Sequence, residues 1–390
     1  MIKVGSDFSG VGAFNQALMR LGVEYKEVFA CDMDKYARQT YIHNYGEPEY
    51  YPENVYKREI PKDSLDIYMT SPPCQAFSLA GKRLGKDDKR GILFFNSLEF
   101  IQVNKPRYFI FENVKGLLSD DNGKTFSEWV NILGGKSVNG LPILFPYEES
   151  VPYHLYWKML NSKEHGVPQN RERVFLVGIR DDSDNSFRFP VEEHLTNRLK
   201  DVLEEDVDDK YFLSENTLST LINNQRFNKY KPIENFNTES SCITSNSGKV
   251  VNSNNYLKIG TWRTHKDGQG FREIEDGSGQ PVNQTLDTGC QQGVILPLFH
   301  WGKGKENERM VYDKKGISPC MTSAMGMGGG YTPSIIQQYK IRRLTPRECF
   351  RLMDFPDTFT WDVSDSQAYK QAGNSIVVNV LYKILKNLNL

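Results

Sequence analysis

Apolar runs that alternate with helical patterns over residues 1–180 constrain the fold more than any other feature of this sequence. Apolar residues recur at helical spacing from Ala13 to Leu21, and Gly22 ends that helix. Runs typical of buried strands lie at residues 2–8, 28–31, 66–70, 108–111 and 174–179. The stretches between them are long enough for crossover helices. We therefore predict an α/β fold in which helices cover both faces of a parallel sheet.

The composition changes after this region. Residues 181–215 hold 12 acidic and 4 basic side chains, and we interpret them as a solvated connection. Residues 248–330 contain 15 of the 31 glycines, which predicts loops and short strands rather than long helices. Helical patterns return after residue 341, with Pro346 at a helix start and an apolar stripe from Ile376 to Leu388. We interpret the loop-rich region as an insertion into the α/β domain.

Length, charge and cysteine spacing exclude several classes of protein. A chain of 390 residues is long enough for two domains and a sizeable core. Its net charge of -1 means that any contact with nucleic acid must be a local patch. No run approaches the roughly 20 apolar residues that span a membrane, and the start lacks a secretory signal, so we expect a cytoplasmic protein. The six cysteines are widely spaced, which argues against disulfides and predicts no metal site.

A glycine-containing turn and a carboxylate follow the first two predicted strands. Phe8-Ser9-Gly10-Val11-Gly12 lies between the first strand and the first helix, where open α/β sheets bind nucleotides. A plain tight turn is the alternative. A dinucleotide site is disfavoured, because Asn15 stands where the pyrophosphate fingerprint needs a small residue. Asp32 ends the second strand and can accept both hydroxyls of a ribose, so a nucleoside without pyrophosphate fits better.

A thiol is presented after the third predicted strand. In Ser71-Pro72-Pro73-Cys74-Gln75 two prolines restrict the backbone before the cysteine. The loop that follows carries Lys82, Arg83, Lys86, Lys89 and Arg90, and it could close over a phosphate backbone. A solvated charged loop is the alternative. The arrangement is nevertheless unusual for a purely structural cysteine, which more often lies within a strand.

The last two predicted strands carry charged side chains. Glu112 ends the strand at 108–111, and a carboxylate there is costly unless it is used or paired. Gln169, Arg171 and Arg173 are expected to share one strand face, because strand side chains alternate with a period of two residues. Two guanidinium groups suit an anion or a pyrimidine carbonyl, and a surface ion-pair cluster is the alternative. Together with a thiol and a nucleoside pocket, these residues suggest covalent chemistry on a pyrimidine.

In motif order the chain resembles the C5-cytosine DNA methyltransferases over residues 1–180 and 340–390. The similar segments are Phe8-Ser9-Gly10-Val11-Gly12 for the cofactor loop, Pro72-Pro73-Cys74-Gln75 for the nucleophile, Glu112-Asn113-Val114 for the acid, Gln169-Asn170-Arg171-Glu172-Arg173 for base anchoring, Arg343-Leu344-Thr345-Pro346-Arg347-Glu348 for packing of the recognition domain, and Gly373-Asn374-Ser375 for closing the cofactor site. The resemblance implies a Rossmann-like S-adenosylmethionine-dependent sheet with an inserted, mostly β target-recognition domain. It further implies a catalytic domain at 1–182, the recognition domain at 183–338, and a segment at 339–390 that completes the catalytic domain.

The family's mechanism assigns roles to four catalytic residues. Cys74 would add to C6 of a flipped-out cytosine, so that C5 can attack the methyl group of S-adenosylmethionine. Glu112 would hold or protonate N3, and Arg173 would bind the carbonyl O2. Arg171 would help to hold the thiolate loop and a nearby phosphate.

The resemblance also implies a set of binding residues. Those expected at the cofactor are Phe8, Ser9, Gly10, Gly12, Asp32, Met33, Asn54, Pro72, Leu93, Asn374 and Ser375. Those expected at DNA are Gln75, Ser78, Lys82, Arg83, Arg90, Gln169, Arg263 and Lys303. Three positions depart from the family pattern: Glu53-Asn54-Val55 replaces Gly-Asp-Ile at the adenine amino group, Met33 replaces an aromatic residue, and Cys320-Met321 replaces a Thr-Leu pair.

The expected partner is double-stranded DNA, with no membrane contact. We expect a monomeric enzyme of the restriction-modification type that associates with the nucleoid when bound to DNA, and a cognate restriction endonuclease in the host is compatible with this reading. The tRNA-methylating branch of the fold is the first alternative, but the large recognition insert favours duplex DNA. A catalytically silent DNA-binding relative is the second, but Cys74 and Glu112 are both present. A pyridine-nucleotide oxidoreductase is the third, disfavoured by Asn15.

Overall fold

The computed structural model describes residues 1–72, 92–180, 186–212, 297–300, 310–312, 316–321, 332, 334–337 and 340–390. All of them belong to one compact unit, formed by Met1–Thr217 and Gln292–Leu390. A second unit, Leu218–Gln291, lies outside the described residues. The boundaries proposed above at residues 182 and 338 stay predictions.

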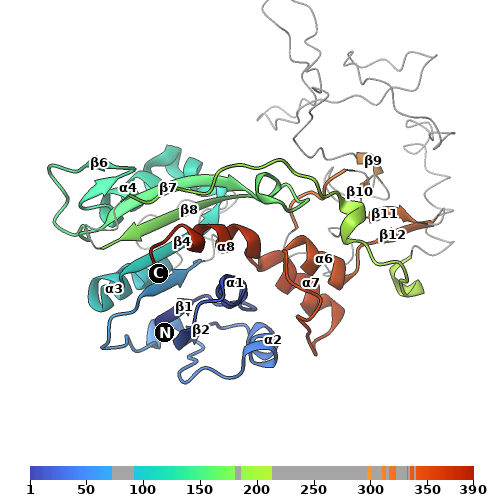
Figure 1. The fold of residues 1–390 in the computed structure, drawn as a ribbon, viewed down its shortest axis with the longest axis horizontal. Helices are drawn as coiled ribbons and strands as arrows, with labels where there is room; N and C mark the ends of the chain where they lie inside the picture. Colours follow the sequence, from blue (N-terminus) through green and yellow to red (C-terminus); the bar gives the residue numbers. More distant parts are fainter. Residues whose placement is uncertain are drawn as a thin grey trace, which may run out of the picture. The chain divides into compact units, whose positions relative to one another are not determined.

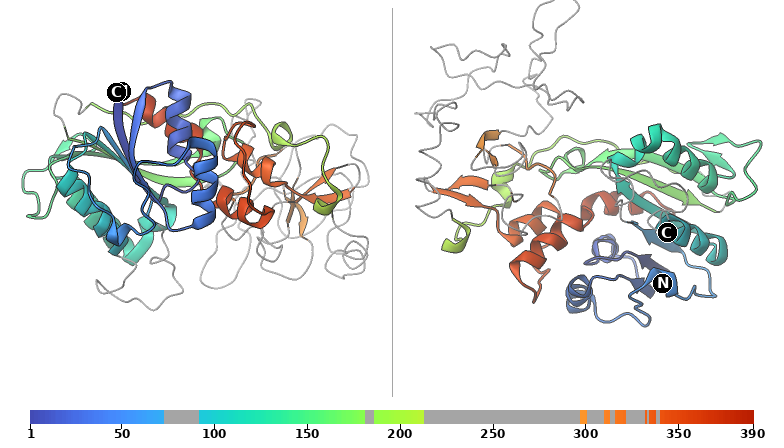
Figure 2. Two further views of the ribbon diagram at one scale, coloured as in Figure 1. Left: turned by 90° about the horizontal axis from the view of Figure 1, so that it is seen from below. Right: turned by 180° about the vertical axis from the view of Figure 1, so that it is seen from behind.

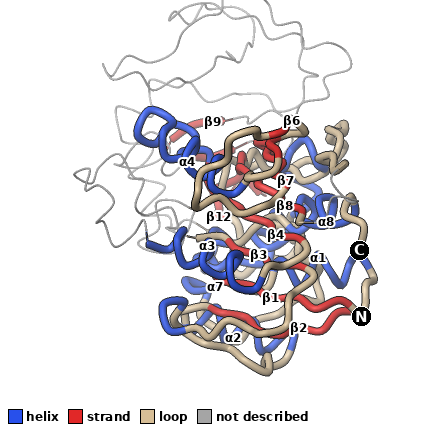
Figure 3. Tube along the Cα trace, turned by 90° about the vertical axis from the view of Figure 1, so that its left-hand side faces the viewer, coloured by secondary structure: helices blue, strands red, loops and turns tan. Residues whose placement is uncertain are grey.

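An eight-stranded sheet in the order β2-β1-β3-β4-β8-β7-β5-β6 forms the centre of this unit (Figures 1 and 3). The strands are β1 (Ile2–Asp7), β2 (Tyr25–Cys31), β3 (Ile67–Thr70), β4 (Tyr108–Val114), β5 (Ser137–Val138), β6 (Leu141–Pro142), β7 (His154–Asn161) and β8 (Glu172–Ile179). Strands β2, β1, β3 and β4 pair in parallel. This half of the sheet confirms the predicted Rossmann-like architecture.

The prediction of a wholly parallel sheet is wrong for β8, which runs antiparallel to β4, and the sequence reading did not include β7. An apolar run buried on both faces looks the same in either direction, so the pattern could not give the orientation of β8. The reversal has a structural consequence. Arg173 near the start of β8 lies opposite Val114 at the end of β4, and therefore at the carboxyl edge of the parallel strands.

Helices cover both faces of the sheet, as predicted. The helices of the described residues are α1 (Ala13–Leu21), α2 (Lys35–Tyr45), α3 (Ile92–Asn104), α4 (Lys124–Leu133), α6 (Pro346–Leu352), α7 (Asp365–Asn374) and α8 (Val378–Lys386), with short 3-10 segments η1 (Val55–Lys57), η3 (Lys115–Gly123), η4 (Ser162–His165), η6 (Leu199–Val202) and η7 (Asp209–Tyr211). Successive strand residues enter different core clusters: Ile67 and Met69 pack on the α1 side, and Tyr68 packs on the α3 side. This alternation is expected for a strand buried on both faces. Among the described residues, no helix has the length and apolarity to cross a bilayer.

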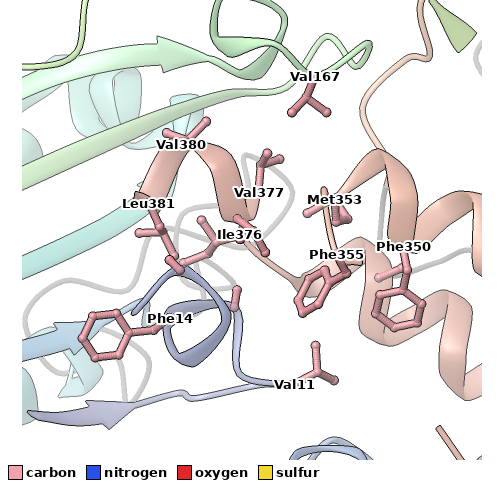
Figure 4. Close-up of a cluster of buried hydrophobic side chains, with 14 of the residues drawn as sticks. Val11, Phe14, Val167, Phe350, Met353, Phe355, Ile376, Val377, Val380 and Leu381 are labelled. Carbon is pink, nitrogen blue, oxygen red and sulfur yellow. The ribbon is translucent and has the colours of Figure 1, made fainter. Parts of the chain in front are cut away.

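The C-terminal helices close one face of the sheet. Helix α8 packs against α1, and Figure 4 shows Phe14 close to Ile376 and Leu381. Phe350 and Phe355 from the α6 region belong to the same buried cluster. Residues more than 300 positions apart in the chain therefore share one apolar core. Burial of such side chains contributes about 1.5 to 3 kcal/mol each.

A second sheet, in the order β12-β11-β10-β9, lies beside α6 and α7 (Figures 1 and 2). Its strands are β9 (Pro297–His300), β10 (Met310–Tyr312), β11 (Ser334–Gln337) and β12 (Lys340–Arg343). Arg342 on β12 is fully buried and donates to Glu348 of α6 at 2.6 and 2.8 Å. Glu348 also accepts from the backbone N–H of Thr345, which completes a capping box with that helix N-cap. The buried ion pair thus fixes the second sheet to the α/β core.

Candidate active site

Those predicted chemical residues that the structure describes lie along one edge of the large sheet. Parallel strands end on the same side, so Phe8 after β1, Asp32 after β2, Ser71 after β3 and Glu112 near the end of β4 lie along the carboxyl edge. The antiparallel β8 brings Arg173 to this edge from its own N-terminal end. The edge therefore collects side chains from five strands.

Glu112 and Arg173 form a buried ion pair at this edge. Arg173 Nε lies 3.0 Å from Glu112 Oε1, and the two side chains are 16% and 10% exposed. Burial raises the pKa of Glu112 above its ordinary value, although Arg173 and Arg171 oppose the shift. A raised pKa makes the carboxyl group easier to protonate, and a protonated carboxyl can donate to a ring nitrogen. The geometry is compatible with the roles expected of both residues.

Arg171 is buried more deeply than Arg173 and donates to backbone carbonyls. Its guanidinium contacts Met321 O at 2.8 Å, Gly373 O at 3.0 Å and Ser375 O at 2.7 Å. Burial, followed by the neighbouring Arg173, lowers the pKa of Arg171 to about 10. The side chain therefore joins the 320–321 segment to the end of α7, and its described contacts are structural.

The expectation that Gln169, Arg171 and Arg173 share a strand face is wrong for the first two, because β8 begins only at Glu172. Gln169 instead forms a parallel bridge with Ser318. Its side-chain amide donates to Leu352 O at 2.7 Å, and its carbonyl accepts from Met321 N at 3.2 Å. Gln169 is fully buried and its side-chain amide contacts the protein through both its nitrogen and its oxygen, and its expected role at DNA stays a prediction.

Cys320 provides a sulfur beside both arginines. The half-buried thiol lies 3.5 Å from Arg171 Nη1 and 3.9 Å from Arg173 Nη2. This residue occupies one of the positions that depart from the family pattern. The described part of the site thus combines a carboxyl group, two guanidinium groups and a free thiol.

The turn after β1 has the backbone that a nucleoside site needs. Gly12 has a φ of 83°, and a Cβ atom there would lie 2.2 Å from the Tyr45 ring, so only glycine fits. Gly10 has a φ of 55° and no atom within 4 Å of the position of a Cβ. Phe8 also has a positive φ, of 58°. A bulky residue in that region costs about 1 to 3 kcal/mol, a strain typical of functional turns.

Asp32 is oriented by two backbone amides. Gly10 N donates to Asp32 Oδ2 and Asp34 N donates to Asp32 Oδ1, each at 2.8 Å. Each oxygen keeps a second acceptor position, which suits two ribose hydroxyls. Burial raises the pKa of Asp32, and the two amide bonds oppose the shift. These residues therefore fit the adenosine part of S-adenosylmethionine.

The other expected cofactor residues differ in burial and in their hydrogen bonds to the rest of the site. Met33 is 86% exposed, and the exposed Asn54 uses its side chain to cap η1 at Tyr56 N. Pro72 O accepts from the Asn113 side chain at 3.2 Å, which ties the segment before Cys74 to the end of β4. Leu93 packs against the core, Asn374 is exposed, Ser375 is buried, and Ser9 is half-buried beside Tyr51.

Several predicted residues lie outside the described residues. They are Cys74, Gln75, Ser78, Lys82, Arg83, Arg90, Arg263 and Lys303. Their roles stay predictions from the sequence.

The sequence reading missed two groups of residues behind the site. Asp7 is buried at the end of β1, where Arg58 Nε lies 2.9 Å from Oδ1 and the Tyr68 hydroxyl donates to Oδ2 at 2.5 Å. Asp7, like Glu112, is a charged residue near the end of a buried strand, so the same sequence feature marks both. Arg38 and Tyr51 form the second group, and no periodic pattern marks them because their contacts connect separate segments.

Comparison with known proteins agrees with this geometry. The family model described as C-5 cytosine-specific DNA methylase matches residues 2–389. The orphan methyltransferase M.SPRI of Bacillus phage SPR is 33% identical, over 99% of this chain and 97% of its own length. The type II methyltransferase M.HhaI of Haemophilus parahaemolyticus is 30% identical, over 98% of this chain and 92% of its own length.

Solved structures share the fold. A mutant of Spodoptera frugiperda DNMT2 superposes with a TM-score of 0.61 at 19% identity, covering 99% of both chains. The Entamoeba histolytica methyltransferase EhMeth gives a TM-score of 0.60 at 16% identity, covering 99% of this chain and 97% of its own. At these identities the likeness concerns the fold alone, and it confirms the α/β methyltransferase architecture.

Proposed function

Because the chain belongs to the C-5 cytosine-specific DNA methylase family and is a DNA (cytosine-5-)-methyltransferase, we propose that it acts on a cytosine flipped out of a specific duplex sequence. S-adenosylmethionine is the methyl donor, and a transient bond joins Cys74 to ring carbon C6. The observation that carries the proposal is the buried pair of Glu112 and Arg173 at the sheet edge. Asn113, next to Glu112, holds the segment that leads to Cys74 through Pro72 O.

The reaction needs electron density at C5, which is a poor nucleophile. Addition of the Cys74 sulfur at C6 breaks the C5–C6 double bond and makes C5 the nucleophilic carbon of a C4=C5 enamine, while Glu112 protonates or holds N3. S-adenosylmethionine, when bound, would supply the electrophilic methyl group, and its S–CH3 bond would break to release S-adenosylhomocysteine as the new bond to C5 forms. A base then removes the C5 proton, and the Cys74 thiolate leaves C6 as the ring double bond is restored.

Glu112 and Arg173 can serve this chemistry because of their burial. The raised pKa of Glu112 favours the protonated carboxyl that N3 requires. Arg173 keeps a partly exposed guanidinium that can donate to the base carbonyl O2. Arg171 and Gln169 act as positioning residues, since they bind the backbone around the site.

The cofactor is held at the ends of β1 and β2. Asp32 accepts from the ribose, and the Phe8-Ser9-Gly10 turn offers backbone groups next to the open space at Gly10. Asn374 and Ser375 close the site from the end of α7. The recognition domain at 183–338, with Arg263 and Lys303, would select the duplex sequence together with the loop that carries Gln75, Ser78, Lys82, Arg83 and Arg90. We expect the enzyme to act as a monomer in the cytoplasm.

The experiment is methylation of plasmid DNA by the purified protein with S-adenosylmethionine, read by bisulfite sequencing. A duplex with 5-fluorocytosine at the mapped target should then form a denaturation-resistant complex that requires the cofactor, because fluorine cannot leave as a proton does. Cys74→Ala should abolish both turnover and the complex. Cys320→Ala is the matched control, since this thiol also lies at the site and should not be needed for trapping. A complex that survives Cys74→Ala would move the nucleophile to another residue.

A further inference from the structure

Three separate segments meet at the adenosine end of the proposed cofactor site. Ser9 N donates to Cys31 O at 3.0 Å, and Asp32 N donates to Pro52 O at 3.3 Å. Gly10 N reaches the Asp32 carboxylate at 2.8 Å. The turn after β1, the turn after β2 and the segment at 51–52 therefore share one hydrogen-bonded edge.

Arg38 of α2 fixes the third of these segments. Its Nη1 donates to Tyr51 O at 2.8 Å and lies 3.2 Å from Pro52 O. The guanidinium carbon lies 3.9 Å from the centroid of the Tyr51 ring, a distance typical of cation–π stacking. Arg38 thus holds both the backbone and the ring of Tyr51.

Tyr51 in turn contacts the Phe8-Ser9-Gly10 turn of the proposed cofactor site. Its hydroxyl lies 3.2 Å from Ser9 Oγ, within hydrogen-bond distance. Its ring also packs against the fully buried Tyr41, with centroids 5.2 Å apart. Burial raises the pKa of Tyr51, so the hydroxyl keeps its proton at any working pH. Tyr51 is only half-buried and borders the same edge as Asp32.

The two residues expected to hold adenine are not fixed in this way. Met33 is 86% exposed, and the side chain of Asn54 is engaged at Tyr56 N at 2.9 Å. Within the described residues, the only side-chain hydrogen bond from the 50–54 segment to the Phe8-Ser9-Gly10 turn comes from Tyr51. The geometry therefore favours Tyr51 over Asn54 as the contribution of this segment.

We infer that Tyr51, held by Arg38, is a positioning residue of the cofactor site that sets the conformation of Ser9 and the turn around it. The inference rests on the proposed function, since it presumes that S-adenosylmethionine binds at this edge. If the turn must be ordered when the cofactor binds, the free-energy cost of ordering it reduces the affinity for the cofactor. The chemical step is unaffected once the cofactor is bound. Loss of the hydroxyl should therefore raise the KM for the cofactor and leave kcat unchanged.

The test compares Tyr51→Phe with Tyr50→Phe in the full chain. Tyr50 is also half-buried, and its hydroxyl accepts from Glu59 N at 2.9 Å, away from Ser9. Loss of one neutral hydrogen bond corresponds to about a 3- to 10-fold effect. Tyr51→Phe should weaken binding of S-adenosylhomocysteine by that factor in calorimetry and raise the cofactor KM equally. Tyr50→Phe should leave both values unchanged.

A second variant tests the role of Arg38. Arg38→Lys keeps the charge but loses the planar group that stacks on Tyr51, so it should weaken cofactor binding in the same direction as Tyr51→Phe. Equal affinities for Tyr51→Phe and Tyr50→Phe would overturn the inference, as would a fall in kcat with an unchanged KM. If the unmodified protein itself fails to bind S-adenosylhomocysteine, the proposed function fails first and takes this inference with it.

Discussion

Replacing Arg171 by methionine tests whether this arginine supports the site through the backbone. Methionine fills much of the same volume but has no donor. Three carbonyl groups, at Met321, Gly373 and Ser375, would lose partners that now lie at 2.8, 3.0 and 2.7 Å. The free energy of unfolding should therefore fall by the amount that these three bonds contribute.

The magnitude follows from the burial of the group. A buried acceptor left without a partner costs about 1 to 3 kcal/mol. Desolvation of the guanidinium is no longer required in the variant, which offsets part of the loss. The lowered pKa of Arg171, about 10, shows that this desolvation opposes the charged form. Taking the low end for each of the three carbonyls gives a loss of about 3 kcal/mol in Arg171→Met.

Urea unfolding followed by circular dichroism measures the loss, and Arg198→Met is the matched control. Arg198 also donates to two backbone carbonyls, Leu195 O at 2.7 Å and Asn197 O at 3.0 Å, but it is only half-buried. Water can replace its bonds, so the control should lose less than about 1 kcal/mol. Equal losses in the two variants would refute the reasoning, because burial would then contribute nothing to the value of these bonds.

The remaining predictions concern the cofactor, the acid, the pH dependence and specificity. Asp32→Ala should weaken S-adenosylmethionine binding by about 1 to 3 kcal/mol in calorimetry, and unchanged affinity would remove the ribose assignment. Glu112→Gln should slow methylation severely while DNA still binds in gel-shift assays, because the amide can meet N3 but cannot supply a proton; normal turnover would contradict this. Burial lowers the pKa of His165 to about 4, so the unfolded chain binds the proton more tightly. The free energy of unfolding should therefore be at its full value above about pH 6.5 and about 2 kcal/mol lower at pH 5. His165→Leu should reduce this loss. An unchanged free energy of unfolding between these pH values would contradict the prediction. Exchange of residues 183–338 for the matching segment of a relative should change the methylated sequence in bisulfite reads, and retention of the original target would place specificity elsewhere.

The sequence pattern selected charged residues at the sheet edge more successfully than the residues that support them. The ends of buried strands identified Asp32 and Glu112, because a carboxylate at such a position is costly unless it is used. The two-residue period of strands gave a wrong prediction for Gln169 and Arg171. Such a period does not show where a strand begins, and β8 begins at Glu172.

Contacts between distant segments explain what could not be predicted. Tyr51 meets Ser9 across 42 positions, and Arg171 meets Ser375 across 204. No local pattern of hydrophobic residues encodes such pairs, because they depend on how strands and helices are placed in space. The direction of β8 also depends on the placement of strands in space, so the sequence pattern could not predict it. That direction places Arg173 at the carboxyl edge of the parallel strands.

The two arginines beside Glu112 differ in burial and in how many of their donors the protein already binds. A guanidinium group has five N–H donors, and each donor bound to the protein is lost to a substrate. Arg171 is only 3% exposed and directs its terminal nitrogens to three backbone carbonyls, so it has little to offer a base. Arg173 is half-buried; its Nε and Nη1 contact Glu112 and Glu172 O, but its Nη2 makes a long contact to the Cys320 sulfur at 3.9 Å. A carbonyl oxygen of a base could displace that weak contact at little cost. In the proposed mechanism Arg173 is therefore better suited than Arg171 to bind the base, whereas Arg171 holds the backbone around it.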